Sequence, residues 1–154
     1  MVNEIGFYSR DEKYGGLSNF HRCEQFVDGY LYPTNEHYYQ SQKALGLEFH
    51  KWIATAPNPY LAMKAGRLLR AGKEGELRPE WEKIKLVIME KGLRAKFQNQ
   101  LLRLRLIQTG DAHLFENSST DDYWGGALPK SKNHLGNLIM KIREEIKNNL
   151  ATSK

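Results

Sequence analysis

The residues best suited to chemistry in this sequence are a glutamate, a glutamine and a lysine: Glu36, Gln40 and Lys43. On an α-helix these positions share one face, so a carboxylate, an amide and an amine would form a row. Such a row can bind a polar substrate and supply acid–base chemistry. A solvated helix face with a glutamate near its N-terminus gives the same pattern, and the spacing alone favours that interpretation. His37 lies off this face and is interpreted as structural.

A second candidate is the sequence Asp-Asp-Tyr-Trp-Gly-Gly at residues 121–126. A tryptophan in a polar loop is unusual, because exposing an indole forfeits favourable burial. One hypothesis is a ring platform on which a base stacks, formed by Trp124 and Tyr123 with the carboxylate of Asp121 beside it. The alternative is a loop whose tryptophan folds back onto the core. The sequence gives the two hypotheses equal weight.

Weaker signals come from an amide, a guanidinium and a loop that leads into a helix. Asn19, Arg67 and the segment with Asn133 and Gly136 are each plausible contacts for a phosphate or a sugar. The sequence contains no Walker loop, dinucleotide-binding glycine motif, zinc-protease motif or nucleophile elbow, which argues against those enzyme classes.

The N-terminal third reads as partly extended. Residues 5–8 predict a short strand, and residues 24–27 and 30–32 predict a β-hairpin around Asp28 and Gly29, a pair that suits a turn with positive φ. Residues 15–19 predict a loop.

From Pro33 onward the pattern is helical. Thr34 can cap a helix that runs to about Gly46. Residues 117–133, polar and rich in glycine, predict a functional loop. Further helices are expected over residues 47–54, 60–71, 101–108 and 135–150 and from Pro79 onward. The helix from Pro79 has an apolar stripe of Trp81, Ile84, Val87, Ile88, Leu93 and Phe97. The helix over 60–71 has Leu61, Lys64, Ala65 and Leu68 at helical spacing, and the helix over 135–150 has Leu135, Leu138, Ile139, Ile142 and Ile146 facing the core.

These elements predict one domain over residues 1–154, mainly α with a small N-terminal β-hairpin or sheet, on the border of α+β. We see no long apolar run and no signal-peptide pattern, so no membrane contact is expected. The single cysteine, Cys23, cannot form an internal disulfide, which favours a reducing, cytoplasmic setting.

The net charge of +5 favours anionic partners such as phosphorylated small molecules, nucleotides or nucleic acid. The positive charges are spread along the chain, and Arg94, Lys96, Arg103 and Arg105 are interpreted as a solvated helix face. The histidines show no ligand spacing and the cysteine has no partner, so no metal site and no cofactor are expected.

The motifs taken together resemble the YbiA-like or NADAR family, in the family's order and along nearly the whole chain. They are Leu-Ser-Asn-Phe at residues 17–20, Asp-Gly-x-x-Tyr-Pro-Thr-x-Glu-His-Tyr-x-Gln-x-Gln-Lys at 28–43, Gly-Arg at 66–67, Trp81, Leu-Arg-Ala-Lys-Phe at 93–97, Leu-x-x-Thr-Gly-Asp at 106–111, Asp-x-Tyr-Trp-Gly at 121–125 and Lys-Asn-x-Leu-Gly at 132–136. No single motif is specific, but their combination is.

The resemblance implies a mainly helical N-glycosidase, which cuts the bond between a ribose-type sugar and a base. Members are similar to enzymes of two kinds: one clears ribosylamino-pyrimidine phosphates of early riboflavin synthesis, and the other removes ADP-ribose from guanine in nucleic acid. The family's acid matches Glu36, its helix tryptophan Trp81, its lysine Lys43, and its loop acid and tryptophan Asp121 and Trp124.

Two points stay open at this stage. After Trp124 relatives commonly have more glycine, whereas here Gly126 is followed by Ala127, Leu128 and Pro129, which could alter the base that is accepted. The resemblance implies that the substrate is a phosphorylated ribosyl compound or an ADP-ribosylated nucleic acid. A module that binds ADP-ribose without cutting it is the alternative from another class, although extra carboxylates do not help to bind a polyanion.

Overall fold

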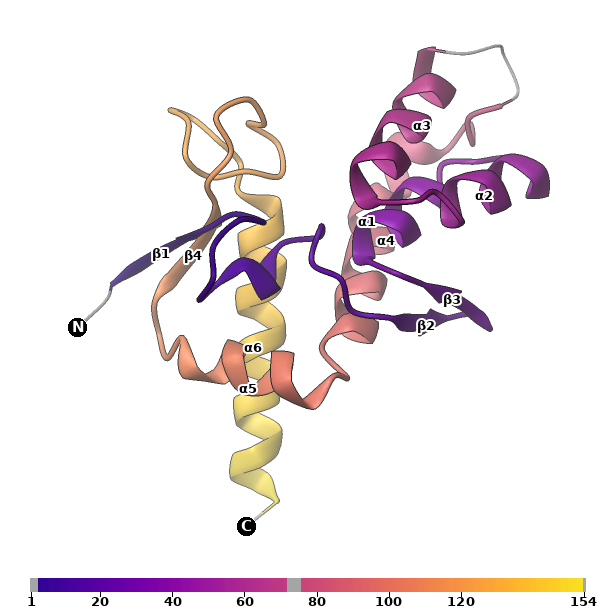
Figure 1. The fold of residues 1–154 in the computed structure, drawn as a ribbon. Coiled ribbons are helices and arrows are strands. Elements are labelled where there is room, and N and C mark those ends of the chain that lie inside the picture. The colour runs from indigo at the N-terminus through magenta and orange to yellow at the C-terminus, as the bar shows by residue number, and fades with distance from the viewer. Residues whose placement is uncertain (1–2, 72–75, 154) are drawn as a thin grey trace. The chain divides into compact units, whose positions relative to one another are not determined.

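Residues 3–71 and 76–153 of the chain are described by the computed structural model (Figure 1). They divide into a terminal unit, Met1–Ser18 with Phe97–Lys154, and a central unit, Asn19–Lys96. Helices predominate and the strands are few and short, so the predicted mainly α fold is confirmed. A single domain over residues 1–154 stays a prediction.

The central unit begins with the predicted hairpin. Strands β2 (Gln25–Val27) and β3 (Tyr30–Tyr32) pair antiparallel, with Val27 opposite Tyr30. The turn residues Asp28 and Gly29 have φ of 52° and 83°. Two consecutive positive φ values match the right-handed twist of the strands, which is why Asp-Gly signals this turn.

Helix α1 (Asn35–Ser41) lies at the centre of this unit, packed against α2, α3 and α4, and every one of its residues is buried. The predicted cap is confirmed, because the Thr34 hydroxyl accepts a hydrogen bond from the His37 amide. The helix ends at Ser41, earlier than the predicted Gly46. His37 bridges Thr34 and the Ala56 carbonyl, and burial lowers its pKa, so its role is structural.

Two of the surrounding helices, α2 (Leu47–Ala54) and α3 (Pro59–Ala71), follow the predicted ranges closely. Of the α3 residues at helical spacing, Ala65 is buried, whereas Leu61 and Leu68 are exposed. The buried positions of α3 are mostly small residues: Ala62, Ala65, Gly66 and Leu69. Small side chains let α3 approach α1 closely.

The long helix α4 (Trp81–Lys96) begins at Trp81 and not at Pro79, because the amide of Trp81 bonds the Arg78 carbonyl in a turn. Its predicted stripe was wrong at Val87, which is 70% exposed, while Met89 is buried. The predicted solvated basic face was wrong at Lys96, which is 1% exposed.

The terminal unit contains a parallel pair of strands, β1 (Glu4–Phe7) and β4 (His113–Glu116), in the register Ile5 to Leu114. The sequence predicted β1 but not β4. The unit also contains a 3-10 turn at Gly15–Leu17 and the helices α5 (Gln100–Gln108) and α6 (His134–Thr152).

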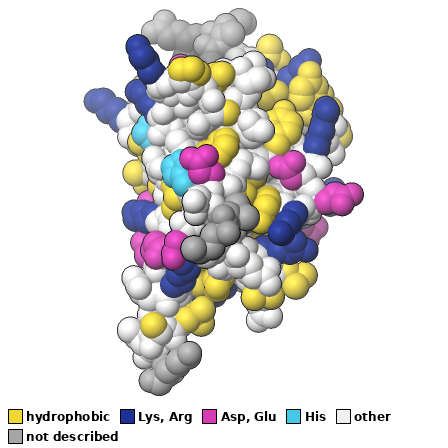
Figure 2. All heavy atoms as spheres, turned by 90° about the vertical axis from the view of Figure 1, so that its left-hand side faces the viewer, with side chains coloured by type: hydrophobic (Ala, Val, Ile, Leu, Met, Phe, Trp, Pro, Cys, Tyr) yellow, Lys and Arg dark blue, Asp and Glu magenta, His cyan; other side chains and the backbone are white. Residues whose placement is uncertain are grey.

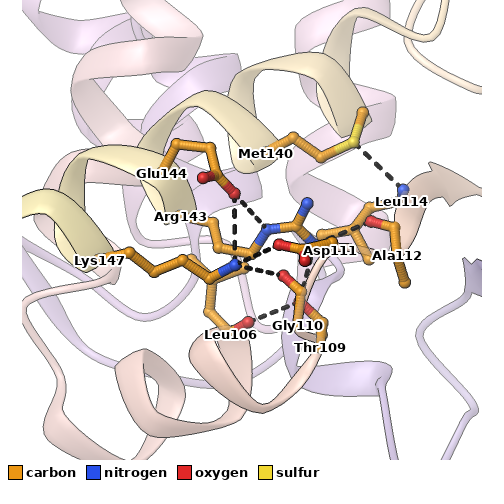
Figure 3. A network of polar contacts seen from close by, with 10 residues as sticks. All are labelled: Leu106, Thr109, Gly110, Asp111, Ala112, Leu114, Met140, Arg143, Glu144 and Lys147. Atoms are coloured by element: carbon orange, nitrogen blue, oxygen red, sulfur yellow. Dashed lines mark hydrogen bonds and ion pairs between the residues drawn. The ribbon is translucent and has the colours of Figure 1, made fainter.

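Helix α6 packs against β4 with its predicted core face, since Leu135, Ile139, Ile142 and Ile146 are buried and only Leu138 is half-buried. The turn between α5 and β4 is tied to this helix (Figure 3). Arg143, itself buried, donates to the Thr109 hydroxyl and the Ala112 carbonyl, and Lys147 bonds Asp111 and the Gly110 carbonyl. The Lys147 ammonium holds the pKa of Asp111 below its usual value. This network accounts for the motif at residues 106–111 as a structural feature.

Among the residues that the structure describes, no helix is long and apolar enough to cross a membrane. On the face drawn in Figure 2, Lys and Arg side chains are dispersed among acidic and hydrophobic ones and form no single patch. This agrees with the spread of charge along the sequence.

Candidate active site

Helix α1 places a buried carboxylate against a buried amide. Glu36 stands in the first turn, is 7% exposed, and accepts a hydrogen bond of 2.7 Å from Gln40 Nε2 to its Oε1. Of the predicted row of Glu36, Gln40 and Lys43, the first two share a helix face, which is buried and not solvated, whereas Lys43 lies beyond the end of the helix. A carboxylate held inside a protein by a neutral amide has the orientation and the environment that general acid–base chemistry uses.

A network of side-chain amides fixes the start of α1. Asn19, a predicted site residue, accepts a hydrogen bond of 2.8 Å from Asn35 at its side-chain oxygen, and its carbonyl accepts one from the Glu36 amide. Asn35 and Asn19 also both donate to the sulfur of Met89. Gln25 bridges Asn35 and the backbone of α4. Asn19 thus helps to position Glu36 through the backbone.

Lys43 lies just beyond the C-cap of α1, and its backbone amide donates a hydrogen bond to the Gln40 carbonyl. Its amine is directed at two aromatic rings: Nζ is 5.4 Å from the centroid of Tyr39 and 5.8 Å from that of Trp81. The two ring centroids are 5.2 Å apart, with the planes at 57°. The three side chains are all buried, Lys43 at 4% and Trp81 at 1% exposure. The structure therefore contains an amine in an aromatic environment.

Gly66 and Arg67 have different roles in α3. A Cβ at Gly66 would collide with Gln40 Oε1, so the glycine permits the close approach of α3 to α1. Arg67 is exposed, as suits a residue that meets a phosphate at the surface, but does not join the buried group of Glu36, Gln40, Lys43 and Trp81.

In the terminal unit, the carboxylate of Asp121 closes a turn of its own loop. Its Oδ1 accepts hydrogen bonds of 2.9 Å from the Tyr123 amide and 2.8 Å from the Trp124 amide. The amide of Asp121 in turn donates to the Ser118 hydroxyl. This arrangement is the turn that aspartate side chains commonly form with the backbone two or three residues on.

The aromatic side chains of this loop form a half-buried cluster. Tyr123 lies with its ring centroid 4.9 Å from Trp124 and 4.5 Å from His134, and the Lys132 amine lies 5.8 Å from the Tyr123 centroid. Trp124 is neither fully exposed nor fully buried. The half-buried ring of Trp124 does not decide between the two hypotheses, so its role as a stacking platform stays a prediction.

The start of α6 binds its own loop. The amides of Asn133, His134 and Leu135 donate to the carbonyls of Gly125, Tyr123 and Trp124, so these donors are already engaged. Asn133 has a positive φ of 51°, and its side chain donates to the Leu114 carbonyl. A Cβ at Gly136 would collide with that same carbonyl. Packing therefore accounts for Asn133 and Gly136, and their predicted contacts with substrate stay predictions.

Three residues of interest were missed by the sequence reasoning. Tyr39 and His134 each sit beside a residue that was singled out, and their aromatic character was the available signal. Lys96 had no such signal, because lysine at the end of a helix is normally solvated. Burial lowers the pKa of Lys96 to about 7.

The Lys96 charge also affects the pKa of two loop residues, His21 and Cys23. Burial and the Lys96 charge lower the pKa of His21, while burial raises the pKa of Cys23 against an opposing effect of Lys96. Among the described residues, no three His, Cys, Asp or Glu side chains converge in a way that could hold a metal ion.

Comparison with known proteins places these features in a family. The model of the NADAR domain matches residues 6–147. The chain is 42% identical over 144 residues to N-glycosidase YbiA of Escherichia coli (strain K12), covering 92% of this chain and 88% of that protein. It is 37% identical over 148 residues to the riboflavin biosynthesis protein VVA0006 of Vibrio vulnificus, covering 95% of this chain and 39% of that protein.

The fold agrees with these sequence relationships. The NMR structure of the E. coli protein YbiA matches with a TM-score of 0.85 and 39% identity, covering 98% of this chain and 89% of that one. The resemblance inferred from the motifs is confirmed, and the chain belongs to the NADAR domain family.

Proposed function

We propose that this chain is an N-glycosidase that hydrolyses the bond between C1′ of a ribose phosphate and the nitrogen of a base. The observation that carries the proposal is the buried carboxylate of Glu36, oriented by Gln40 on a helix that also leads to Lys43. The names of the relatives, N-glycosidase and riboflavin biosynthesis protein, support the same class of reaction.

In the proposed reaction, water adds a hydroxyl group to C1′ and its proton goes to the departing base. Positive charge develops on the sugar and negative charge on the base. The carboxylate of Glu36 stabilises the sugar cation and activates the water, as carboxylates do in other glycoside hydrolysis. The Gln40 amide holds this carboxylate in one orientation. Asp121 was predicted to share this task, and that role stays a prediction.

Lys43 has two possible tasks. As an ammonium it would neutralise the phosphate or the departing base. As a neutral amine it would attack C1′ of the ring-opened sugar, form a Schiff base, release the base as an amine, and be freed by water. Borohydride distinguishes the two, because it fixes a sugar on Lys43 only if the Schiff base forms.

The first substrate to test is a ribosylamino-pyrimidine phosphate of early riboflavin synthesis. The second is DNA that carries ADP-ribose on guanine, which the net charge of +5 favours. The readout is the free base released from each by the purified chain. If neither base is released while ADP-ribose binds, the chain is a binding module and the proposal fails.

Variants then test the site. In Glu36→Gln the side chain keeps an oxygen that can accept from Gln40 but loses its charge, so we expect at least a hundredfold loss of kcat with the fold retained. Glu48→Gln, in the exposed first turn of α2, is the matched control and should behave as the wild type. Near-native turnover in both Glu36→Gln and Asp121→Asn would refute the site assignment.

A further inference from the structure

We propose that Tyr39 and Trp81 form an aromatic clamp that positions the amine of Lys43, which makes Tyr39 a positioning residue for the reaction. The inference rests on the proposed function for its role in turnover. The contact of the Lys43 amine with the two rings does not depend on any substrate.

The clamp is built from two parts of the central unit. Tyr39 comes from α1 and precedes Lys43 by four positions, while Trp81 is the first residue of α4. Their rings approach to 5.2 Å, and the Lys43 amine lies within 6 Å of both centroids. Within this distance the negative face of an aromatic ring attracts a cation, most strongly when water is excluded, as it is around these buried side chains.

The backbone also links two of these residues, Lys43 and Trp81, through Arg78. The carbonyl of Lys43 accepts the amide of Arg78, and the carbonyl of Arg78 accepts the amide of Trp81. Two consecutive backbone hydrogen bonds therefore connect the lysine to the tryptophan.

The indole of Trp81 contributes a ring face and no hydrogen bond. Its Nε1 is buried and has no partner among the described residues, although a buried indole N–H normally finds one. An indole placed only for core packing bears the cost of its unsatisfied donor, which phenylalanine would avoid. The neighbouring cation explains why a tryptophan occupies this position, since indole is the strongest of the cation-binding rings.

The test compares a ring-retaining variant with ring-deleting ones. Tyr39→Phe keeps the π face, whereas Tyr39→Leu and Tyr39→Met remove it and keep an apolar side chain. Tyr60→Leu is the matched control, because Tyr60 lies in a lysine–aromatic pair that is exposed, with the Lys64 amine 4.9 Å from its ring.

Two quantities are measured in each folded variant: the rate of reductive methylation of Lys43 by formaldehyde and cyanoborohydride, read by peptide mass spectrometry, and the kcat and KM for base release. We expect Tyr39→Leu and Tyr39→Met to raise the labelling rate at least tenfold and to lower kcat at least tenfold, with KM changed less than threefold. Tyr39→Phe should stay within twofold of the wild type in both.

The clamp is refuted if the ring-deleting variants leave the labelling of Lys43 and kcat unchanged, or if Tyr39→Phe loses as much as Tyr39→Leu. Increased labelling of Lys43 in a chain that releases no base from any substrate would support the clamp and refute the proposed function. The two failures are thus distinguishable.

Discussion

The two segments with the most chemical character, helix α1 and the loop at residues 117–133, use their polar groups in opposite ways. In α1 the side chains of Glu36 and Gln40 contact each other inside the central unit, and Gln40 Oε1 has no hydrogen-bond partner among the described residues. In the loop, the carboxylate of Asp121 serves backbone amides of its own turn.

The difference follows from the backbone. At the start of α1 the Thr34 hydroxyl and the Asn19 carbonyl serve the free helix amides, so the side chains of Glu36 and Gln40 are left to bond each other. An irregular loop must find partners for its backbone groups, and short polar side chains supply them. A carboxylate on a buried helix is therefore stronger evidence of function than one in a loop. Four changes can break or sharpen this comparison.

The largest expected effect concerns another buried ionisable side chain of the central unit, Lys96. Its pKa is lowered by burial to about 7, whereas in the unfolded chain it has the ordinary value of 10.5. Between these values only the unfolded chain binds the proton, so stability rises with pH from about 7 upward, by up to about 1.4 kcal/mol per pH unit. Below pH 7 both states are protonated and the dependence vanishes.

Lys96→Met should remove this dependence. Urea unfolding at pH 6.5, 7.5 and 8.5 gives the free energy of unfolding of both chains, and the wild type should gain on the variant as pH rises. Lys51→Met, at an exposed position of α2, should run parallel to the wild type. Parallel curves for Lys96→Met would show that this lysine is not a buried charge.

In the terminal unit, Gly136→Ala tests whether packing alone explains a predicted site residue. The added methyl group would collide with the Leu114 carbonyl, and we expect a loss of about 1–3 kcal/mol in unfolding free energy. Gly46→Ala is the matched control, because a Cβ there meets nothing within 4 Å. If Gly136→Ala is as stable as Gly46→Ala but binds substrate poorly, contact with the substrate explains the glycine better.

The loop turn is tested by two substitutions of Asp121. Asparagine keeps the oxygen that accepts from Tyr123 and Trp124, whereas alanine removes it and leaves two amides without their partner. We expect Asp121→Ala to lose about 1–2 kcal/mol in a thermal or urea unfolding measurement and Asp121→Asn to stay near the wild type. A large loss of kcat in a stable Asp121→Asn would instead show that the charge takes part in the reaction, as the sequence predicted.

The sequence predicted an element of this fold correctly where the residues that signal it act on their own stretch of backbone. Asp28–Gly29 and Thr34 act through their own backbone, and the turn and cap that they predicted are present. Strand β4 has no such local marker: it exists because Leu114 and its neighbours pair with β1. The exposure of Val87 and the burial of Lys96 depend likewise on what packs against α4.

The site followed the same rule. Helical spacing correctly put Glu36 and Gln40 on one face, but spacing could not show that this face is buried, because burial depends on three other helices. The motif resemblance, unlike spacing, marked Glu36 and Trp81 as candidate site residues. It did not reveal the contact between Trp81 and Lys43. Tyr39 was overlooked since an aromatic residue at helical spacing is most often simple core.

The smallest effect is expected at Arg67, the one predicted central-unit site residue that is exposed and outside the buried group. Arg67→Ala should leave the free energy of unfolding within about 0.5 kcal/mol of the wild type, because surface substitutions seldom matter to stability. If its guanidinium binds the substrate phosphate, KM should rise several-fold with kcat little changed, the pattern of lost uniform binding, and the effect should shrink as salt is added. Arg22→Ala, at another exposed position of the same unit, controls for the change in net charge. An equal rise in KM for both variants would assign the effect to overall charge and remove Arg67 from the site, leaving the buried side chains around α1 to account for recognition.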